Sequence, residues 1–131
     1  MPFLILLTVL LIFILFGLFL FWRSKRRFAK KDRNLVRRHW IRIKDKASYD
    51  PKGALIEADS LIDLILKKRG YSGNLAAKLK RAAPLFSNIN EVWMAHRLRN
   101  RAVHETGFSV NPQAVGRFLE AYRKAIDDLL R

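Results

Sequence analysis

Residues 91–105 read EVWMAHRLRNRAVHE. The apolar residues of this stretch recur mostly at spacings of three and four, the period at which side chains of an α-helix fall on one face. They are Val92, Ala95, Leu98, Ala102 and Val103. The pattern predicts a helix with one buried face, which must pack against other helices because nothing in the chain reads as a strand of useful length.

Polar residues occupy a second face of the same predicted helix. His96, Asn100 and His104 are four residues apart and stack along one line, and Arg97 falls close to that line. A guanidinium binds a phosphate through two fixed donors, and an imidazole can move a proton near neutral pH. The stretch therefore suits phosphate chemistry, although a solvated helix face that carries Arg and His explains the same residues.

Arg99, Asn100 and His104 fit the motif of the HEPN superfamily, small all-helical domains found in many RNA-cutting toxins and defence proteins. In that motif an Arg and a polar residue are followed, after three or more residues, by a His near the end of a helix. Further stretches resemble a group of small bacterial membrane-anchored HEPN-like proteins, and the resemblance covers about residues 41–130. These stretches are ALIEAD (54–59), KRGYSG (68–73), FSN (86–88) and WMAH (93–96).

The resemblance implies metal-independent RNA cleavage, in which the ribose 2′-hydroxyl attacks the neighbouring phosphate and leaves a cyclic phosphate and a free 5′-hydroxyl. In that scheme His104 assists proton transfer, Arg99 stabilises the added negative charge, and Asn100 orients His104 or a phosphate oxygen. The family usually pairs two protomers so that two motifs converge, which implies a homodimer through this helix. Neighbouring residues expected to bind the substrate are His96, Arg97 and Arg101.

Two further expectations concern the surroundings of this motif. Arg99 and His104 lie about 140° apart around an ideal helix, so either the helix ends near His104 or the long Arg side chain reaches around. Glu57, in the helix expected before it, either is a surface residue or supports the site by orienting an Arg or His. No metal or cofactor is expected, because no carboxylate lies at ligand spacing to two of the three His, and Cys is absent.

Residues 3–22 are apolar, interrupted only by Thr8 and Gly17, and contain no charged residue. This segment is long enough for one helix across the roughly 30 Å hydrocarbon core. Phe21 and Trp22 would lie at the membrane interface. A cleaved signal peptide is the competing interpretation, but no Lys or Arg precedes the apolar run and no small-x-small cleavage site follows it. We therefore expect an uncleaved anchor.

The net charge of +15 is concentrated next to this anchor, because residues 23–46 contain 12 Lys and Arg against two Asp, a net +10. The basic flank predicts a single-pass protein of the inner (plasma) membrane with its C-terminal domain in the cytoplasm. Arg23–Lys46 would also attract anionic lipid headgroups, at about 1 kcal/mol per basic residue. An arm that grips RNA is the other interpretation.

Apolar stripes and cap residues predict further helices at about 28–47, 51–69, 74–83 and 111–130. Asp50-Pro51 and Asn111-Pro112 read as N-cap and first-turn pairs, and Gly70 and Pro84 as stops. The fold class is all-α: an antiparallel bundle of four main helices and a short one after a single transmembrane helix. The expected organisation is an anchor (1–22), a basic juxtamembrane helix (23–47) and a HEPN-like bundle (48–131).

Three functions remain open from the sequence. The first is a membrane-anchored endoribonuclease in stress or defence. The second is a non-catalytic HEPN-like module that binds RNA, a nucleotide or a protein at the cytoplasmic face of the membrane. The third is a structural anchor in which the Arg and His side chains serve contacts within the chain or a dimer.

Overall fold

The structure is a computed structural model that describes the backbone of residues 1–25 and 28–131 and the side chains of residues 1–20 and 28–131. Every regular element in these ranges is helical, which confirms the predicted all-α class. The α-helices are α1 (Pro2–Lys25), α2 (Lys30–Ala47), α3 (Pro51–Lys68), α4 (Leu75–Ala82), α5 (Ile89–His104) and α6 (Pro112–Leu130), and a 3₁₀ turn, η1 (Ala83–Leu85), follows α4.

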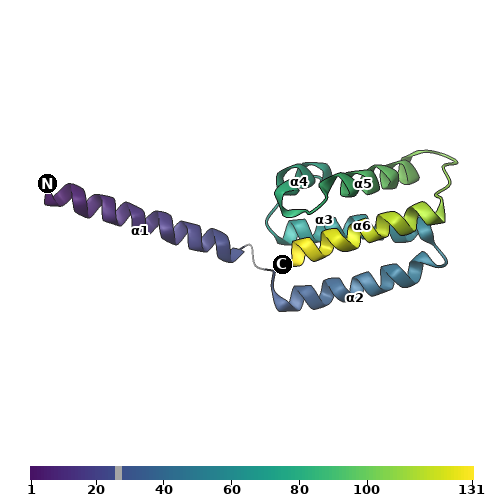
Figure 1. The fold of residues 1–131 in the computed structure, drawn as a ribbon, viewed down its shortest axis with the longest axis horizontal. Helices are drawn as coiled ribbons and strands as arrows, with labels where there is room; N and C mark the ends of the chain where they lie inside the picture. The colour runs from purple at the N-terminus through teal and green to yellow at the C-terminus, as the bar shows by residue number, and fades with distance from the viewer. Residues whose placement is uncertain (26–27) are drawn as a thin grey trace.

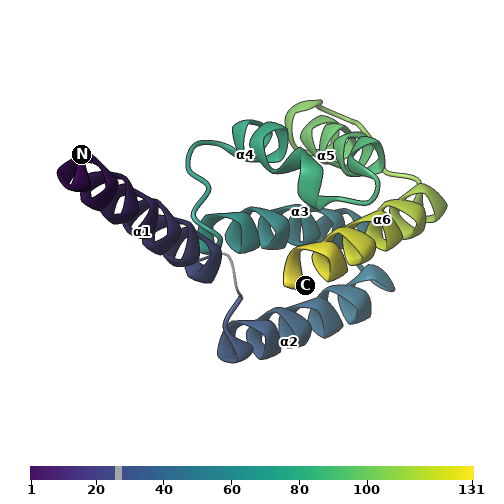
Figure 2. The ribbon, with the colours of Figure 1, turned by 60° about the vertical axis from the view of Figure 1, so that its left-hand side comes forward.

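The four long helices after α1 form the predicted bundle, with α3 and α6 packed together in its centre (Figure 1). Helix α2 covers this central pair on one side and α5 covers it on the other. Successive long helices run in opposite directions, so α3 and α6 are parallel to each other (Figure 2). Helix α4 and η1 bridge from α3 to α5, and α4 packs on α3.

The predicted caps fix where the helices begin. Asp50 accepts a hydrogen bond from the backbone N–H of Gly53 at 2.8 Å, and Asn111 accepts one from Gln113 at 2.9 Å. Asn88 accepts a hydrogen bond from the backbone N–H of Glu91 at 3.3 Å and caps α5. Gly70 has a φ of +92°, a backbone conformation that other residues rarely adopt, and it turns the chain away from α3.

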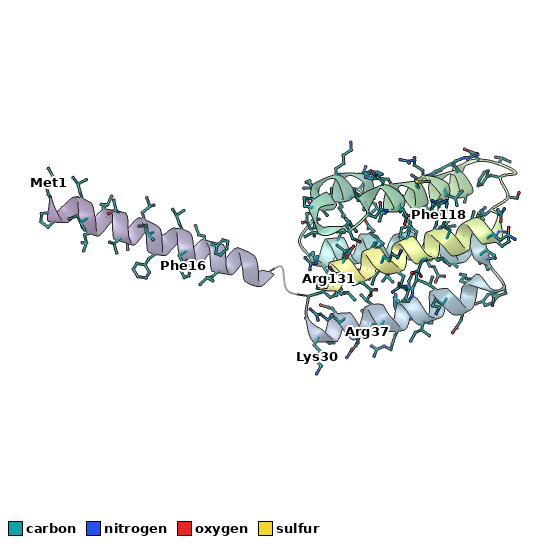
Figure 3. All side chains as sticks on the ribbon, in the orientation of Figure 1. Met1, Phe16, Lys30, Arg37, Phe118 and Arg131 are labelled. Atoms are coloured by element: carbon teal, nitrogen blue, oxygen red, sulfur yellow. The ribbon has the colours of Figure 1, made fainter. Side chains whose placement is uncertain are left out.

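The core lies where the inward faces of the long helices meet (Figure 3). Helix α2 contributes buried Val36 and Ile43, and Phe28 just before it is also buried. Trp40 is half-buried against the same core. The fully buried large side chains are Leu55, Ile62, Ile65, Leu66, Leu79, Tyr122 and Leu129.

Helix α1 extends away from the bundle (Figures 1 and 2). Its segment Pro2–Leu20 is long and apolar enough to cross a membrane, and none of that segment is buried in the protein. A helix whose exposed side chains are apolar apart from Thr8 is poorly suited to water. The predicted interface residues Phe21 and Trp22 lie outside the described side chains.

Candidate functional site

A buried carboxylate, that of Asp59 on α3, is the centre of the polar network inside the bundle. Its side chain is only 4% exposed. The hydroxyl of Tyr122 on α6 donates a hydrogen bond to Oδ1 at 2.6 Å, and Nδ1 of His96 on α5 lies 2.8 Å from the same oxygen. Nε of Arg99 lies 3.3 Å from Oδ2. One carboxylate thus joins α3, α5 and α6.

The partners of His96 define its tautomer. A carboxylate accepts hydrogen bonds, so Nδ1 carries the proton and donates a hydrogen bond to Asp59. Nε2 is then an acceptor, and it lies 3.2 Å from the amide nitrogen of Asn100. The other end of that amide, Oδ1, accepts a hydrogen bond from Nη1 of Arg99 at 3.0 Å. Asp59, His96, Asn100 and Arg99 therefore form a closed polar ring.

The contact between Arg99 and Asp59 is ionic rather than a well-aligned hydrogen bond. Nε of Arg99 is buried and has no hydrogen-bond partner among the described residues, despite its 3.3 Å separation from Oδ2. The Arg99 side chain as a whole is 26% exposed. The guanidinium is thus held at the edge of the core, where it can still meet a ligand.

The polar ring opens into a cavity of about 480 Å³ between α3, α5 and the start of α4. This volume is within the range of small-molecule sites, about 300–1,000 Å³. Gly73, with a φ of +95°, and Asn74, the N-cap of α4, form the opposite wall. The remaining lining residues are Ser60, Asp63, Leu75 and Ala76.

Tyr122 donates its hydrogen bond to the Asp59 carboxylate from inside the core, where the Tyr122 side chain is fully buried. Burial raises the pKa of the Tyr122 hydroxyl well above its usual value, and the neighbouring Asp59 carboxylate raises it further. The phenol therefore stays protonated and keeps donating to Asp59. It supports the ring but does not line the cavity.

The predicted site residues on α5 divide into two sets. His96, Arg99 and Asn100 converge on the cavity. His104 is the last residue of α5 and is exposed outside the cavity, so the helix ends where the motif ends. Arg97 and Arg101 are also exposed, and Arg101 pairs with Glu105 at 2.9 Å and stacks over the Phe108 ring. The motif Arg and His therefore do not meet within one protomer.

Of the two interpretations of Glu57, the structure agrees with the surface one, and Asp59 makes the supporting contact. Glu57 is exposed and accepts a hydrogen bond from Lys46 on α2 at 2.6 Å, beside a separate cavity that His39 and Arg42 also line. Two residues along a helix are about 200° apart, so Glu57 and Asp59 face opposite sides of α3. Only Asp59 faces α5 and α6.

Sequence reasoning left Asp59 and Tyr122 out of the site, although both carry a recognisable signal. Asp59 follows Leu55 by four residues and precedes Ile62 by three, so it falls on the apolar stripe of its helix. A carboxylate at a core position needs buried donors. Tyr122 follows Leu119 by three residues and precedes Ile126 by four, so it falls on the apolar stripe of the last helix, where a hydroxyl is a buried donor.

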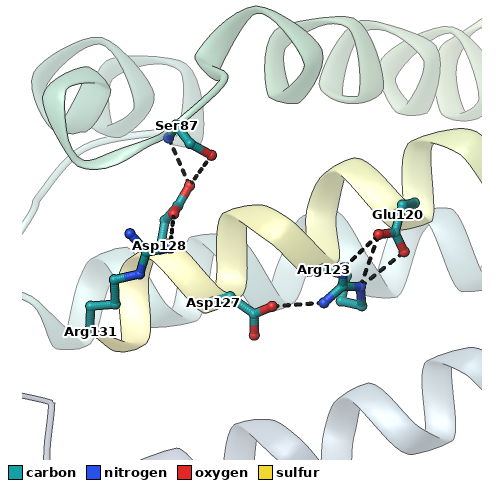
Figure 4. Close-up of polar contacts among 6 residues, drawn as sticks. All are labelled: Ser87, Glu120, Arg123, Asp127, Asp128 and Arg131. Carbon is teal, nitrogen blue, oxygen red and sulfur yellow. Dashed lines mark hydrogen bonds and ion pairs between the residues drawn. The ribbon is translucent and has the colours of Figure 1, made fainter.

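A second buried acid fixes the approach to α5. Oδ2 of Asp128 on α6 accepts hydrogen bonds from the backbone N–H and the hydroxyl of Ser87, both at 2.7 Å (Figure 4). Ser87 immediately precedes Asn88, the N-cap of α5. The contact holds the start of α5 on α6, and so sets the position from which His96 and Arg99 reach Asp59.

No family model, curated protein or solved structure matches this chain. Among the described residues, no group of three His, Asp or Glu side chains converges to hold a metal ion. The chemistry that the site presents is an oriented imidazole, a carboxamide and a guanidinium around one cavity, fixed by a buried carboxylate.

Proposed function

We propose that this protein is a single-pass membrane protein whose helical bundle is HEPN-like and cleaves RNA without a metal ion at the cavity between α3 and α5. The observation that carries the proposal is the closed ring of Asp59, His96, Asn100 and Arg99 at that cavity. It holds a proton acceptor and a phosphate-binding cation side by side. The basic flank of α1 supports a cytoplasmic bundle, where RNA is present.

His96 is the better placed of the two α5 imidazoles to act as the general base. Asp59 accepts a hydrogen bond from the Nδ1–H of His96, which fixes the ring orientation and stabilises the imidazolium that forms. When substrate displaces the Asn100 amide, Nε2 takes the proton of the ribose 2′-hydroxyl. The 2′-oxygen then bonds to phosphorus as the bond from phosphorus to the 5′-oxygen breaks.

Arg99 stabilises the phosphate as its negative charge grows, because its guanidinium is at the cavity edge and already polarised by Asp59. The leaving 5′-oxygen needs a proton. His104 is exposed at the end of α5, outside the cavity. In this scheme it delivers that proton to RNA held between two protomers, which keeps the homodimer as part of the proposal.

The exposed face of α5 supports such a pairing. Met94, Arg97, Arg101 and His104 follow one another at spacings of three and four and are all exposed. This line combines an apolar residue with three basic or titratable ones. It suits contact with a phosphate backbone or with a second copy of the helix.

A second candidate is a non-catalytic module that binds RNA, a nucleotide or a protein at the membrane. The observation that favours it is the pairing of Arg99 with Asp59, which neutralises much of the cation, together with the position of His104 outside the cavity. A protomer in this arrangement has one imidazole at the cavity and no second imidazole there to serve as the general acid.

The two candidates are separated by RNA cleavage and RNA binding measured on the same samples. Full-length protein in a mild detergent is incubated with labelled single-stranded RNA in excess chelator. We expect cleavage that falls by about 10²-fold or more in His96→Gln and His104→Gln. His39→Gln, a change of the same kind on α2 away from the cavity, should leave the rate unchanged.

Each alternative outcome has a defined meaning. Intact RNA together with salt-sensitive binding that Arg99→Ala weakens would establish the non-catalytic module. Equal cleavage by wild type, His96→Gln and His104→Gln would reject the proposed site. Because His104 is exposed, its variant should keep the melting temperature of the wild type, so lost cleavage there cannot be attributed to unfolding.

A further inference from the structure

A second cavity, of about 460 Å³, lies between α2 and α6, on the side of the bundle away from α5. Its floor is apolar and its edges are basic. The apolar residues are Trp40, Ile41, Ile126 and Leu130. Ile41 is 59% exposed, whereas the other three are buried or half-buried. We call this cavity the α2/α6 groove.

The charges at the edge of the α2/α6 groove favour an anion. Arg33 and Arg37 come from α2 and Arg131 follows α6. Arg123 also lines the groove, but its guanidinium is paired with Asp127 at 2.8 Å, so this pair contributes little net charge. Arg131 is paired with Asp128 at 3.4 Å. Arg33 and Arg37 are therefore the two groove arginines that have no acidic partner among the described residues.

Two buried donors belong to residues that line the α2/α6 groove and have nothing to bind within the described part of the chain. Nε of Arg33 and the indole Nε1 of Trp40 are both buried and meet no acceptor among the described residues. A buried N–H without a partner costs free energy. Trp with its N–H at a polar boundary and its ring on apolar groups is typical of membrane interfaces.

The α2/α6 groove also lies at the end of the bundle that receives the anchor. Helix α2 begins at Lys30, five residues after α1 ends at Lys25, and buried Phe28 fastens the chain to the core between them. The C-terminal end of α6 lies at the same end of the bundle (Figures 1 and 2). Arg33 and Arg131 are therefore close to the plane where α1 enters a membrane.

We propose that the α2/α6 groove binds one anionic phospholipid of the membrane that α1 crosses. Such a lipid supplies a phosphate for Arg33 and Arg37, ester oxygens for the two donors without a partner, and an apolar chain for the floor. RNA would satisfy the arginines but not the floor around Ile41. The α2/α6 groove shares no lining residue with the cavity between α3 and α5, so lipid binding there can be tested independently of RNA cleavage.

Lipid binding is measured by native mass spectrometry of the full-length protein in a neutral detergent, titrated with phosphatidylglycerol. Phosphatidylcholine with the same acyl chains is the comparison lipid. We expect one phosphatidylglycerol to be retained with an affinity at least about tenfold higher than phosphatidylcholine, and Arg33→Ala/Arg37→Ala to lose about tenfold or more of it. Ile41→Ser, at an exposed position that folding does not need, should also weaken retention.

The matched control is Lys31→Ala/Arg38→Ala, which removes the same charge from exposed positions of α2 that do not line the groove. It should retain the lipid within about twofold of wild type, whereas an equal loss in both double variants would show general charge attraction and overturn the site. Equal retention of the two lipids would overturn it too. So would displacement of the lipid by a short single-stranded RNA, which would assign the groove to nucleic acid.

Discussion

Replacing Asp59 by Ala should be the most damaging single change in the bundle. The carboxylate is 3.3 Å or less from donors on Tyr122, His96 and Arg99, and it is almost fully buried. Its removal leaves a hydroxyl, an imidazole N–H and a guanidinium without their acceptor. Breaking a buried ion pair by removing one partner costs about 3–5 kcal/mol. A domain of this size is stable by only about 5–15 kcal/mol.

The assay is urea unfolding of the full-length protein in a mild detergent, followed by the fluorescence of its Trp residues. We expect Asp59→Ala to lower the free energy of unfolding by about 3–5 kcal/mol, and the melting temperature by at least about 12 °C. Tyr122→Phe removes one donor and leaves the ionic contacts, so it should cost about 1 kcal/mol. Asp45→Ala, the same change at an exposed position, should stay within about 0.5 kcal/mol.

The reasoning is wrong if Asp59→Ala unfolds within about 1 kcal/mol of the wild type. That result would mean that the three donors find other acceptors or water at little cost. The closed ring around the cavity would then not be the element that holds α3, α5 and α6 together.

Three further predictions use the same unfolding assay. Gly53→Ala should destabilise by about 1 kcal/mol because a Cβ there would overlap the N-cap carboxylate of α3, whereas Gly116→Ala, exposed and without a neighbour within 4 Å, should stabilise by about 0.5–1 kcal/mol. Tyr122 has a raised pKa, so the folded state keeps a proton that the unfolded state loses above about pH 10. Wild type should then lose up to about 1.4 kcal/mol per pH unit between pH 10 and 11 relative to Tyr122→Phe, and parallel curves would contradict the raised pKa. Asp63→Ala should lower the free energy of unfolding by about 1–2 kcal/mol because it leaves the buried ammonium of Lys78 without its carboxylate partner. Lys78→Met should be nearly neutral, and the reverse order of the two effects would refute this explanation.

The bundle could be predicted because local signals agree with the final packing. The N-caps Asp50 and Asn111 each precede a Pro that sits in the first turn, and the stripe from Leu119 to Ile126 is buried as its spacing predicts. Element boundaries in the bundle differ by one or two residues, mainly at α2, which begins at Lys30 rather than at about 28. Such ends depend on loop contacts that periodicity does not reveal.

The site was harder to predict because it depends on contacts between helices. Spacing along α5 brought His96 and Asn100 together, but it could not show that Arg99 would turn toward a carboxylate 40 residues earlier in the chain. Glu57 and Asp59 lie two residues apart on opposite faces of α3, and the burial of Asp59 depends on how that helix packs against α5 and α6. The exposure of His104 depends on the end of α5 at that residue, which periodicity alone does not reveal.

The most direct test of the proposed activity is an analysis of the ends produced from RNA by the full-length protein in chelator. The substrate pair is one short RNA and the same RNA with a single 2′-deoxy nucleotide at the main cleavage position. We predict 2′,3′-cyclic phosphate and 5′-hydroxyl ends from the first, no cut at the substituted position in the second, and neither product with Arg99→Ala. Intact RNA from the wild type, or cutting that the 2′-deoxy substitution does not affect, would contradict metal-independent cleavage through the 2′-hydroxyl.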